Sequence, residues 1–453
     1  MNEERIEQAG CAKRRAAPAC HWLNVGVAAA LALVVTAAPG RAQDTVPAGV
    51  RIGLTYDRSG KPAVALAPVA GPNADSVFAI MARDLDFSDR LTVIRQDSGD
   101  APTGALNYDL YAKLNAAAVV QATVTPTGGL HIAVHEVAGK RVALVMDLPL
   151  PSPALSRDWR HVVHIASDSV EWSVLGRPGI ASTRIAYTIQ YGGAITLVDF
   201  DGEGAWQVPG THDCLSPSWD PTGTKVACNA LPEGNSPSRI EVHDLATGRK
   251  WTTRATGNNQ TAVFSPDGRT IVFSAGSDAQ DLYSVPVYSD SAPRRLTSRR
   301  GSLNVSPDFS PDGRKIVFTS SILGHPEVYI MDADGSSADL LTSSGFGDDL
   351  YRSDPAFSPD GRRVAFQSRI KGTFQVMAIS VADKSTVQLT SEGANESPSW
   401  APDGRHIVFV STRTGRRELW VLDAESSRAR QLTHGGRAQN PAWSPRLSFP
   451  RQP

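Results

Sequence analysis

The sequence predicts an α+β N-terminal domain followed by an all-β six-bladed propeller, closed by pairing of N- and C-terminal propeller strands. Three observations support this fold class. A short motif built on an aromatic residue recurs six times between residues 219 and 445. The region before the repeats mixes helix-like and strand-like patterns, which is typical of a separate α/β domain. The first and the last repeats are incomplete in complementary ways, which indicates that they form one blade together.

The first 42 residues have the order of a secretory signal peptide. A basic segment, Lys13–Arg15, precedes the apolar run Trp22–Val35, and small residues then lead to Ala42. Export requires this order of charge, apolar stretch and small residues, and the apolar run is too short to span a membrane. We therefore expect cleavage after Ala42 and an exported mature chain, with an uncleaved anchor as the alternative.

Residues 43–178 are predicted to form the α/β domain. Its strand-like runs are Val50–Thr55, Ala63–Leu66, Leu91–Ile94, Ala118–Val124, Leu130–Glu136 and Val142–Leu148. Its helix-like stretches are Ala74–Leu85, Asn107–Leu114 and Asp158–Leu175. Alternating apolar residues indicate the strands, and apolar residues three and four apart indicate the helices. The segment Gly176–Gly179 contains two glycines and a proline, and we expect it to lead into the propeller at residue 179.

The propeller, predicted over residues 179–453, is indicated by a repeated hairpin. An aromatic residue precedes a turn, most often Ser-Pro-Asp-Gly, and the six aromatic residues are Trp219, Phe264, Phe309, Phe357, Trp400 and Trp443. Proline presets φ for the turn, aspartate caps its backbone, and glycine supplies the positive φ of a bulged hairpin. Two further strand-like runs and a second tight turn follow in each unit. Four strands about every 44 residues are typical of a propeller blade.

The chain ends predict how the ring closes. The first blade has the strand-like runs Arg184–Tyr187 and Thr196–Asp199 but no aromatic motif ahead of them. The last motif, Ala442–Pro445, is followed only by a short tail. The C-terminal segment is therefore predicted to supply the inner strand of the first blade. This closure removes a sheet edge that would otherwise be open to aggregation.

Composition and charge exclude several classes of protein. The chain has 45 Lys and Arg against 46 Asp and Glu, a net charge of −1, whereas a nucleic-acid binder normally has a basic stripe. Four cysteines in 453 residues are too few for a disulfide scaffold. Two of them, Cys214 and Cys228, would remain after export, on neighbouring strands but not directly opposite each other. We expect buried thiols, with a disulfide as the alternative.

Several segments resemble the TolB family, the periplasmic component of the Tol–Pal envelope system. They are Val50–Ile52, Arg83–Leu91, Ala118–Val124, Thr183–Tyr187, the propeller repeats and Asn440–Pro445. The resemblance covers nearly the whole mature chain. It implies a periplasmic, non-enzymatic adaptor, monomeric, with no cofactor, no bound nucleic acid and no membrane insertion.

Two protein partners follow from this resemblance. In the family, the extreme N-terminus engages the inner-membrane protein TolA, and one propeller face docks the peptidoglycan-associated lipoprotein Pal. The system supports outer-membrane constriction at cell division and envelope integrity. The resemblance implies contact with a TolA-like protein at Val50, Arg51, Ile52 and Asp57. This chain departs from the family at Gln43–Gly49, which precede the first strand.

The lipoprotein is predicted to dock where the innermost strands begin. Loops entering these strands vary from blade to blade, whereas the Pro-Asp-Gly turns on the opposite face are short and repetitive. The predicted contact residues are Asn258, Asn259, Gln260, Thr261, Asn304, Val305, Ser353, Glu396 and Gln439. Three of these, Asn258, Thr261 and Val305, match positions that the resemblance implicates in lipoprotein contact.

Metal-binding patterns in the sequence are weak. The segment Asp332–Ser336 imitates the start of a calcium loop, but a serine stands where the bidentate glutamate should be, so we interpret it as a tight turn. The pairs His131/His135 and His161/His164 have no third ligand nearby in sequence. We expect these histidines to be solvated or packed.

A catalytic function remains an alternative. A serine peptidase would need a Gly-x-Ser-x-Gly elbow, and the sequence has none. A metal-dependent propeller hydrolase such as a lactonase would need ligands that converge in the channel from several blades. The candidates are Asp354, Glu396 and Asn440. A surface propeller with no role in the Tol system is a third possibility.

Overall fold

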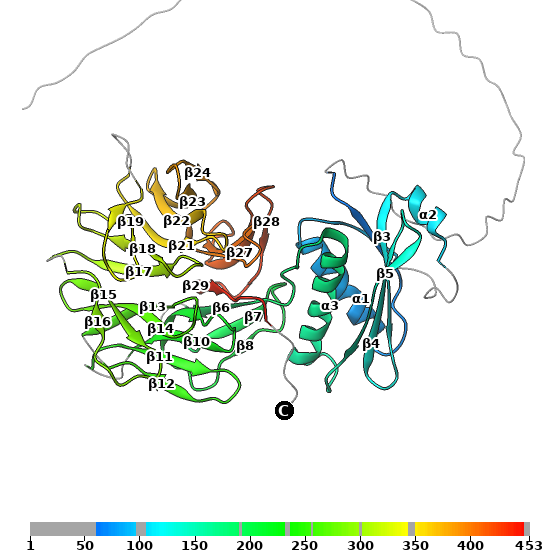
Figure 1. Ribbon diagram of the computed structural model, residues 1–453, viewed down its shortest axis with the longest axis horizontal. Helices are drawn as coiled ribbons and strands as arrows, with labels where there is room; N and C mark the ends of the chain where they lie inside the picture. Colours follow the sequence, from blue (N-terminus) through cyan, green and yellow to red (C-terminus); the bar gives the residue numbers. More distant parts are fainter. Residues whose placement is uncertain are drawn as a thin grey trace, which may run out of the picture. The chain divides into compact units, whose positions relative to one another are not determined.

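The computed structural model describes residues 60–96, 106–189, 193–231, 236–254, 257–298, 301–342 and 349–447. Within them, an α/β region precedes a six-bladed propeller of antiparallel sheets, which confirms the predicted fold class (Figure 1). The predicted signal peptide, residues 1–42, lies outside the described residues. None of the helices in the described ranges is both long enough and apolar enough to cross a membrane.

The α/β region is a five-stranded sheet with strand order β2-β1-β3-β4-β5. Its elements are β1 (Ala63–Leu66), α1 (Ala74–Phe87), β2 (Thr92–Arg95), α2 (Tyr108–Lys113), β3 (Ala116–Val124), β4 (Gly129–Glu136), β5 (Arg141–Pro149) and α3 (Arg157–Leu175). Strand β1 pairs in parallel with β2 and β3, and the other pairs are antiparallel. Every predicted element of this region that falls within the described residues is present, with bounds within two residues. The predicted strand Val50–Thr55 lies outside the described residues.

Helix α3 shows how the local sequence determines where a helix begins and ends. It begins after Ser156, whose Oγ accepts a hydrogen bond from the backbone N–H of Trp159. It ends at Gly176, whose φ of +64° is the left-handed conformation that glycine adopts most readily. Between these ends, Val163 and Val170 are fully buried in the core that α3 shares with α1 and the sheet.

Each of the six blades is a four-stranded antiparallel sheet. Blade 1 contains β29 (Ala438–Trp443), β6 (Arg184–Ile189), β7 (Thr196–Asp199) and β8 (Trp206–Gln207); blade 2 contains β9 (Cys214–Trp219), β10 (Lys225–Ala230), β11 (Arg239–Asp244) and β12 (Lys250–Thr252). Blade 3 contains β13 (Asn258–Phe264), β14 (Thr270–Gly276), β15 (Gln280–Pro286) and β16 (Arg294–Arg295); blade 4 contains β17 (Asn304–Phe309), β18 (Lys315–Ser320), β19 (Glu327–Asp332) and β20 (Asp339–Leu340). Blade 5 contains β21 (Arg352–Phe357), β22 (Arg363–Ile370), β23 (Thr373–Ser380) and β24 (Thr386–Gln388); blade 6 contains β25 (Asn395–Trp400), β26 (His406–Ser411), β27 (Glu418–Asp423) and β28 (Ala429–Gln431).

The ring closes as the sequence predicts, because β29 pairs with β6. Trp443 lies opposite Ile185 in this antiparallel pair, and Figure 1 shows the red C-terminal strand beside the green first blade. The indole Nε1 of Trp443 donates to Thr183 Oγ1 at 2.8 Å, and the backbone N–H of Arg184 donates to Ser444 Oγ at 2.9 Å. These bonds join residues some 260 positions apart in the chain.

Buried ion pairs join α1 and α3 to the propeller. Asp201, which follows β7, lies 2.9 Å from Arg83 of α1 and 2.9 Å from Arg160 of α3. His164 of α3 places Nδ1 2.9 Å from an Oδ of Asp84. The side chains of Asp84, His164 and Asp201 are close enough to hold a metal ion. Because two guanidinium groups already neutralise Asp201, we interpret the cluster as an ion-pair network.

A second network joins the end of α1 to blade 6. Asp403 lies 2.7 Å from Nδ1 of His406, and Asp89 lies 3.3 Å from Nε2 of the same imidazole. Arg90 reaches Asp403 at 3.3 Å, and Arg428 reaches Asp89 at 2.9 Å. His406 is fully buried. Since Asp89 and Arg90 belong to the α/β region and the others to the propeller, these ion pairs hold the two together.

His164 is held in its charged form by its neighbours. Burial alone would lower the pKa of this imidazole, but the carboxylates of Asp84 and Asp199 outweigh burial and raise it to about 10. In the unfolded chain the pKa returns to about 6.5. A pKa raised by folding contributes stability that is fully present below pH 6.5 and is lost as the pH rises towards 10.

The strand pairing predicts that the C-terminus is needed for stability. Truncating the buried Trp443 to alanine leaves a cavity, and the Trp443→Ala variant should lose about 3–5 kcal/mol of unfolding free energy. Deleting residues from Asn440 onward should in addition expose the edge of β6 and promote aggregation. Thermal melting with light scattering measures both effects. Val387→Ala, at a side chain 57% exposed, is the control and should change little. Unchanged melting in both C-terminal variants would mean that the ring is closed elsewhere.

The buried imidazole predicts a pH dependence of folding. The free energy of unfolding should fall between pH 6.5 and 10 by on the order of 5 kcal/mol. The His164→Gln variant should lose this part of the dependence, because an amide does not titrate. Urea titrations at several pH values measure the change. His131→Gln is the matched control, since His131 pairs with Asp147 at the surface. Equal pH profiles for wild type and His164→Gln would contradict the assignment.

Candidate partner-binding face of the propeller

The six innermost strands share three consecutive positions with three different environments. Counted back from the aromatic residue that ends each strand, these are the fifth, fourth and third positions. We call the fifth the latch position, the fourth the rim position and the third the ring position. All predicted lipoprotein contacts except Asn258 belong to one of them. Because the same positions recur in every blade, their side chains gather at one end of the inner strands.

The latch positions are buried in all six blades. They are Cys214, Asn259, Asn304, Arg352, Asn395 and Ala438. Asn304 shows what such a residue does. Its Nδ2 donates to Gln280 O and Asp281 Oδ1 at 3.2 Å, and its Oδ1 accepts from Ser320 Oγ at 2.7 Å. Two of the predicted contact residues, Asn259 and Asn304, thus have buried amides that fix the start of their strands, and the amide of Asn395 is buried in the same way in blade 6.

The rim positions are partly exposed in five blades. They are Leu215, Gln260, Val305, Ser353, Glu396 and Gln439, of which Ser353 is buried. Glu396 pairs with Arg417 at 2.8 Å, and Gln439 Nε2 donates to Ile189 O at 3.2 Å. Asn258, just before the latch position of blade 3, is exposed. The rim therefore presents apolar, amide and carboxylate side chains that differ from blade to blade.

The ring positions share an unusual backbone conformation. Ser216, Thr261, Ser306, Asp354, Ser397 and Asn440 all have positive φ, between 34° and 52°. The strand ladder shifts register beside each of them. In five blades a proline follows, and because proline has no N–H it cannot continue the ladder. The proline that stands two residues before the aromatic residue in these five blades is a sequence signal for the bulge, and the predictions from sequence missed it.

Ring residues of different blades bond to one another. Ser306 Oγ donates to Asp354 Oδ1 at 2.7 Å, and Ser397 Oγ lies 3.5 Å from Asp354 Oδ2. The backbone N–H of Ser306 donates to Thr261 Oγ1 at 3.1 Å. Burial raises the pKa of Asp354, although the hydroxyl of Ser306 opposes that effect. These bonds connect neighbouring blades at the channel and restrict how the rim can move.

Each candidate ligand for a hydrolase already has a protein partner in this structure. Asp354 contacts Ser306 and Ser397, Glu396 pairs with Arg417, and Asn440 donates to Ser216. Among the described residues, two groups of His, Cys, Asp and Glu side chains are close enough together to hold a metal: Asp84, His164 and Asp201, and Cys214, Cys228 and His243, in which the two cysteines are bonded to each other. The predicted tight turn at Asp332 is present, since Gly335 N–H donates to Asp332 O.

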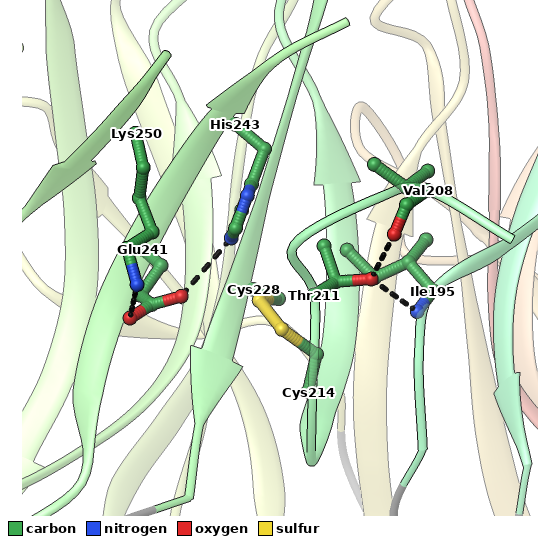
Figure 2. Close-up of a disulfide and its surroundings, with 8 residues drawn as sticks. All are labelled: Ile195, Val208, Thr211, Cys214, Cys228, Glu241, His243 and Lys250. Atoms are coloured by element: carbon green, nitrogen blue, oxygen red, sulfur yellow. Dashed lines mark hydrogen bonds and ion pairs between the residues drawn. A yellow bond between two sulfur atoms is a disulfide. The ribbon is translucent and has the colours of Figure 1, made fainter. Parts of the chain in front are cut away.

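The expectation of free thiols was wrong, because Cys214 and Cys228 form a disulfide (Figure 2). Cys214 lies opposite Ala230, so Cys228 is its diagonal neighbour, as expected. Diagonal neighbours in a regular ladder are about 7–8 Å apart. The register shift between Ala227 and Asn229 brings the two Cα atoms to 5.6 Å, within the disulfide range. The bulge could not be located from the cysteine spacing alone.

The residues predicted to contact an inner-membrane partner, Val50, Arg51, Ile52 and Asp57, lie outside the described residues. Their role stays a prediction from the resemblance.

Comparison with known proteins gives consistent results. A protein named Tol-Pal system protein TolB, from Methylococcus capsulatus, is 30% identical over 228 residues, which cover 47% of this chain. The match spans about half, 53%, of that relative's length. The crystal structure of TolB from Acinetobacter baumannii superposes with a TM-score of 0.73 at 25% identity, over 87% of this chain and 98% of that one.

The sequence profile of the TolB β-propeller domain matches residues 173–447. This match includes all six blades and, with them, the latch, rim and ring positions. The chain belongs to the TolB β-propeller family.

Proposed function

We propose that this protein is a periplasmic, non-enzymatic scaffold of the Tol–Pal system. It would link inner-membrane Tol proteins to a peptidoglycan-associated outer-membrane lipoprotein, and so support outer-membrane constriction during division and envelope integrity. Membership of the TolB family supports a role in the Tol–Pal system. The rim of varied, partly exposed side chains supports docking of the lipoprotein on this face of the propeller. The rim is the single observation that carries the proposal, because it offers blade-specific chemistry on a fixed frame.

A fixed frame favours binding for a physical reason. Ordering a mobile loop costs roughly 0.5–1.5 kcal/mol for each immobilised side chain. The buried latch amides and the ring hydrogen bonds hold the rim backbone before any partner arrives. A loop of the lipoprotein that enters the channel mouth would find Asn258, Gln260 and Gln439 as hydrogen-bonding side chains and Val305 as an apolar contact. The predicted contacts Asn259 and Asn304 would then act by positioning this surface, together with Asn395 in blade 6.

If the lipoprotein docks on this face, a charge introduced there should weaken lipoprotein binding. In the Val305→Glu variant, a carboxylate without a partner would be buried at the interface and cost about 2–5 kcal/mol of binding. The dissociation constant should therefore rise at least about 30-fold. Thr261→Glu should act in the same direction. Calorimetry with the purified lipoprotein measures the change, and melting temperatures check that each variant folds.

The matched control is Arg314→Glu, at an exposed position on the opposite, Pro-Asp-Gly face. It should leave lipoprotein affinity unchanged. Equal losses on both faces, or no loss on either, would refute the docking site.

The N-terminal contact is tested by deletion. The segment 43–60 is proposed to add to a TolA-like partner as an extended strand, a common mode of peptide recognition. A chain that begins at residue 61 should keep the melting transition of the propeller and lose binding to the inner-membrane partner in a pull-down with purified proteins. Retained binding would show that this part of the family resemblance does not apply to the chain.

A further inference from the structure

A groove of about 830 Å³ lies between blades 3 and 4, on the face opposite the rim. The Pro-Asp-Gly turns of both blades border it, through Pro266, Asp267 and Asp312. Its floor includes Val272 and Phe309. The sequence predicts little scope for recognition on this face, since its turns are short and repetitive. Blade 3 departs from that pattern.

The first departure is Pro286 at the end of β15. Blades 2, 4 and 6 have an aspartate at this position, Asp244, Asp332 and Asp423, and blade 5 has a serine. Asp244 Oδ1 accepts the backbone N–H groups of residues 246 and 247 and so tightens the turn. Proline has no side-chain acceptor. Seven residues then separate β15 from β16, against five or six at the same place in blades 2, 4, 5 and 6.

The second departure is a small polar side chain inside the groove. Ser284 stands where the other four blades with this strand motif have Val242, Ile330, Ala378 and Val421. Beside it, Phe309 is partly exposed, whereas the aromatic residues at the same position in the other five blades are all buried. A missing aliphatic side chain and a wider loop together open the groove down to an aromatic ring.

The shape and charge of the groove indicate what it binds. It is open to solvent, whereas a pocket for a small molecule normally encloses most of its ligand. Asp267 and Asp312 are exposed at its border, and hydrogen bonds from Ser265 and Ser310 lower the pKa of each carboxyl, so both are charged at neutral pH. Arg294, the basic residue of the lining, donates to the backbone carbonyl of Asp334, and the lining therefore carries two carboxylates against one guanidinium, a net charge of −1. An open groove with a net negative charge and an exposed aromatic ring suits an extended peptide that has a basic and an apolar residue.

We propose that the groove between blades 3 and 4 is a second protein-docking site, which takes an extended segment with a basic residue towards Asp267 and Asp312 and an apolar residue against Phe309. The site does not rest on the function proposed above. Because it lies at the opposite end of the inner strands from the rim, a segment bound here leaves the rim free. The propeller would then hold two partners at once, one on each face.

The experiment selects displayed random octapeptides on the full chain, then resynthesises the enriched peptides and titrates them by fluorescence polarisation. Enriched peptides should contain Lys or Arg together with an apolar residue. Ser284→Ile, which restores the side chain that blade 4 has at this position, should fill the groove and weaken binding at least tenfold. Its melting temperature should be unchanged or higher, because the added side chain packs on Phe309 and Val272.

A charge variant with a matched control completes the test. Asp312→Asn should weaken binding, and Asp360→Asn should not, although both aspartates accept a serine hydroxyl and a backbone N–H in equivalent turns. Three results would overturn the proposal: no enriched peptide, enrichment of acidic peptides, or equal binding to wild type and Ser284→Ile. Competition between an enriched peptide and a lipoprotein bound at the rim would overturn the claim of two independent faces.

Discussion

The pairing of β29 with β6 is the constraint on which the rest of the structure depends. Each blade packs on its neighbours, so a ring of six blades has a defined geometry only when the first and last are joined. Here the join uses strand hydrogen bonds and the buried Trp443, whose indole bonds to Thr183. Every surface built from more than two blades needs this closure. The rim and the ring of channel residues are both of that kind.

Closure of the ring does not by itself make a binding face. The side chains at the start of the inner strands form that face. Their latch residues are buried, their ring residues adopt positive φ, and the rim residues lie between them. Along three consecutive positions, the residues that hold the backbone are therefore separate from the residue that a partner can contact. Two positions hold the backbone, and the third carries side chains that differ from blade to blade.

Much of the fold could be predicted from the sequence because it depends on short-range patterns. The aromatic and Pro-Asp-Gly motifs determined the blade number, and the incomplete first and last repeats determined the closure. The ion pairs between α1, α3 and the propeller could not be predicted, since they join residues such as Asp89 and His406 that are 317 positions apart. The disulfide depended on a bulge, and burial of Asn259 and Asn304 depended on side chains supplied by neighbouring strands. The candidate contact residues were found as a set, but their separate environments needed the three-dimensional structure.

The most direct test of a fixed, two-sided propeller is hydrogen–deuterium exchange of the full chain with and without its purified lipoprotein partner. We expect slower exchange in the segments that begin the inner strands, around residues 258–261, 304–306, 352–354, 395–397 and 438–440. Exchange in the Pro-Asp-Gly turns at 265–268 and 310–313 should be unchanged. Slower exchange in those turns, or no change at the rim, would contradict the central claim that the varied strand starts form the docking face.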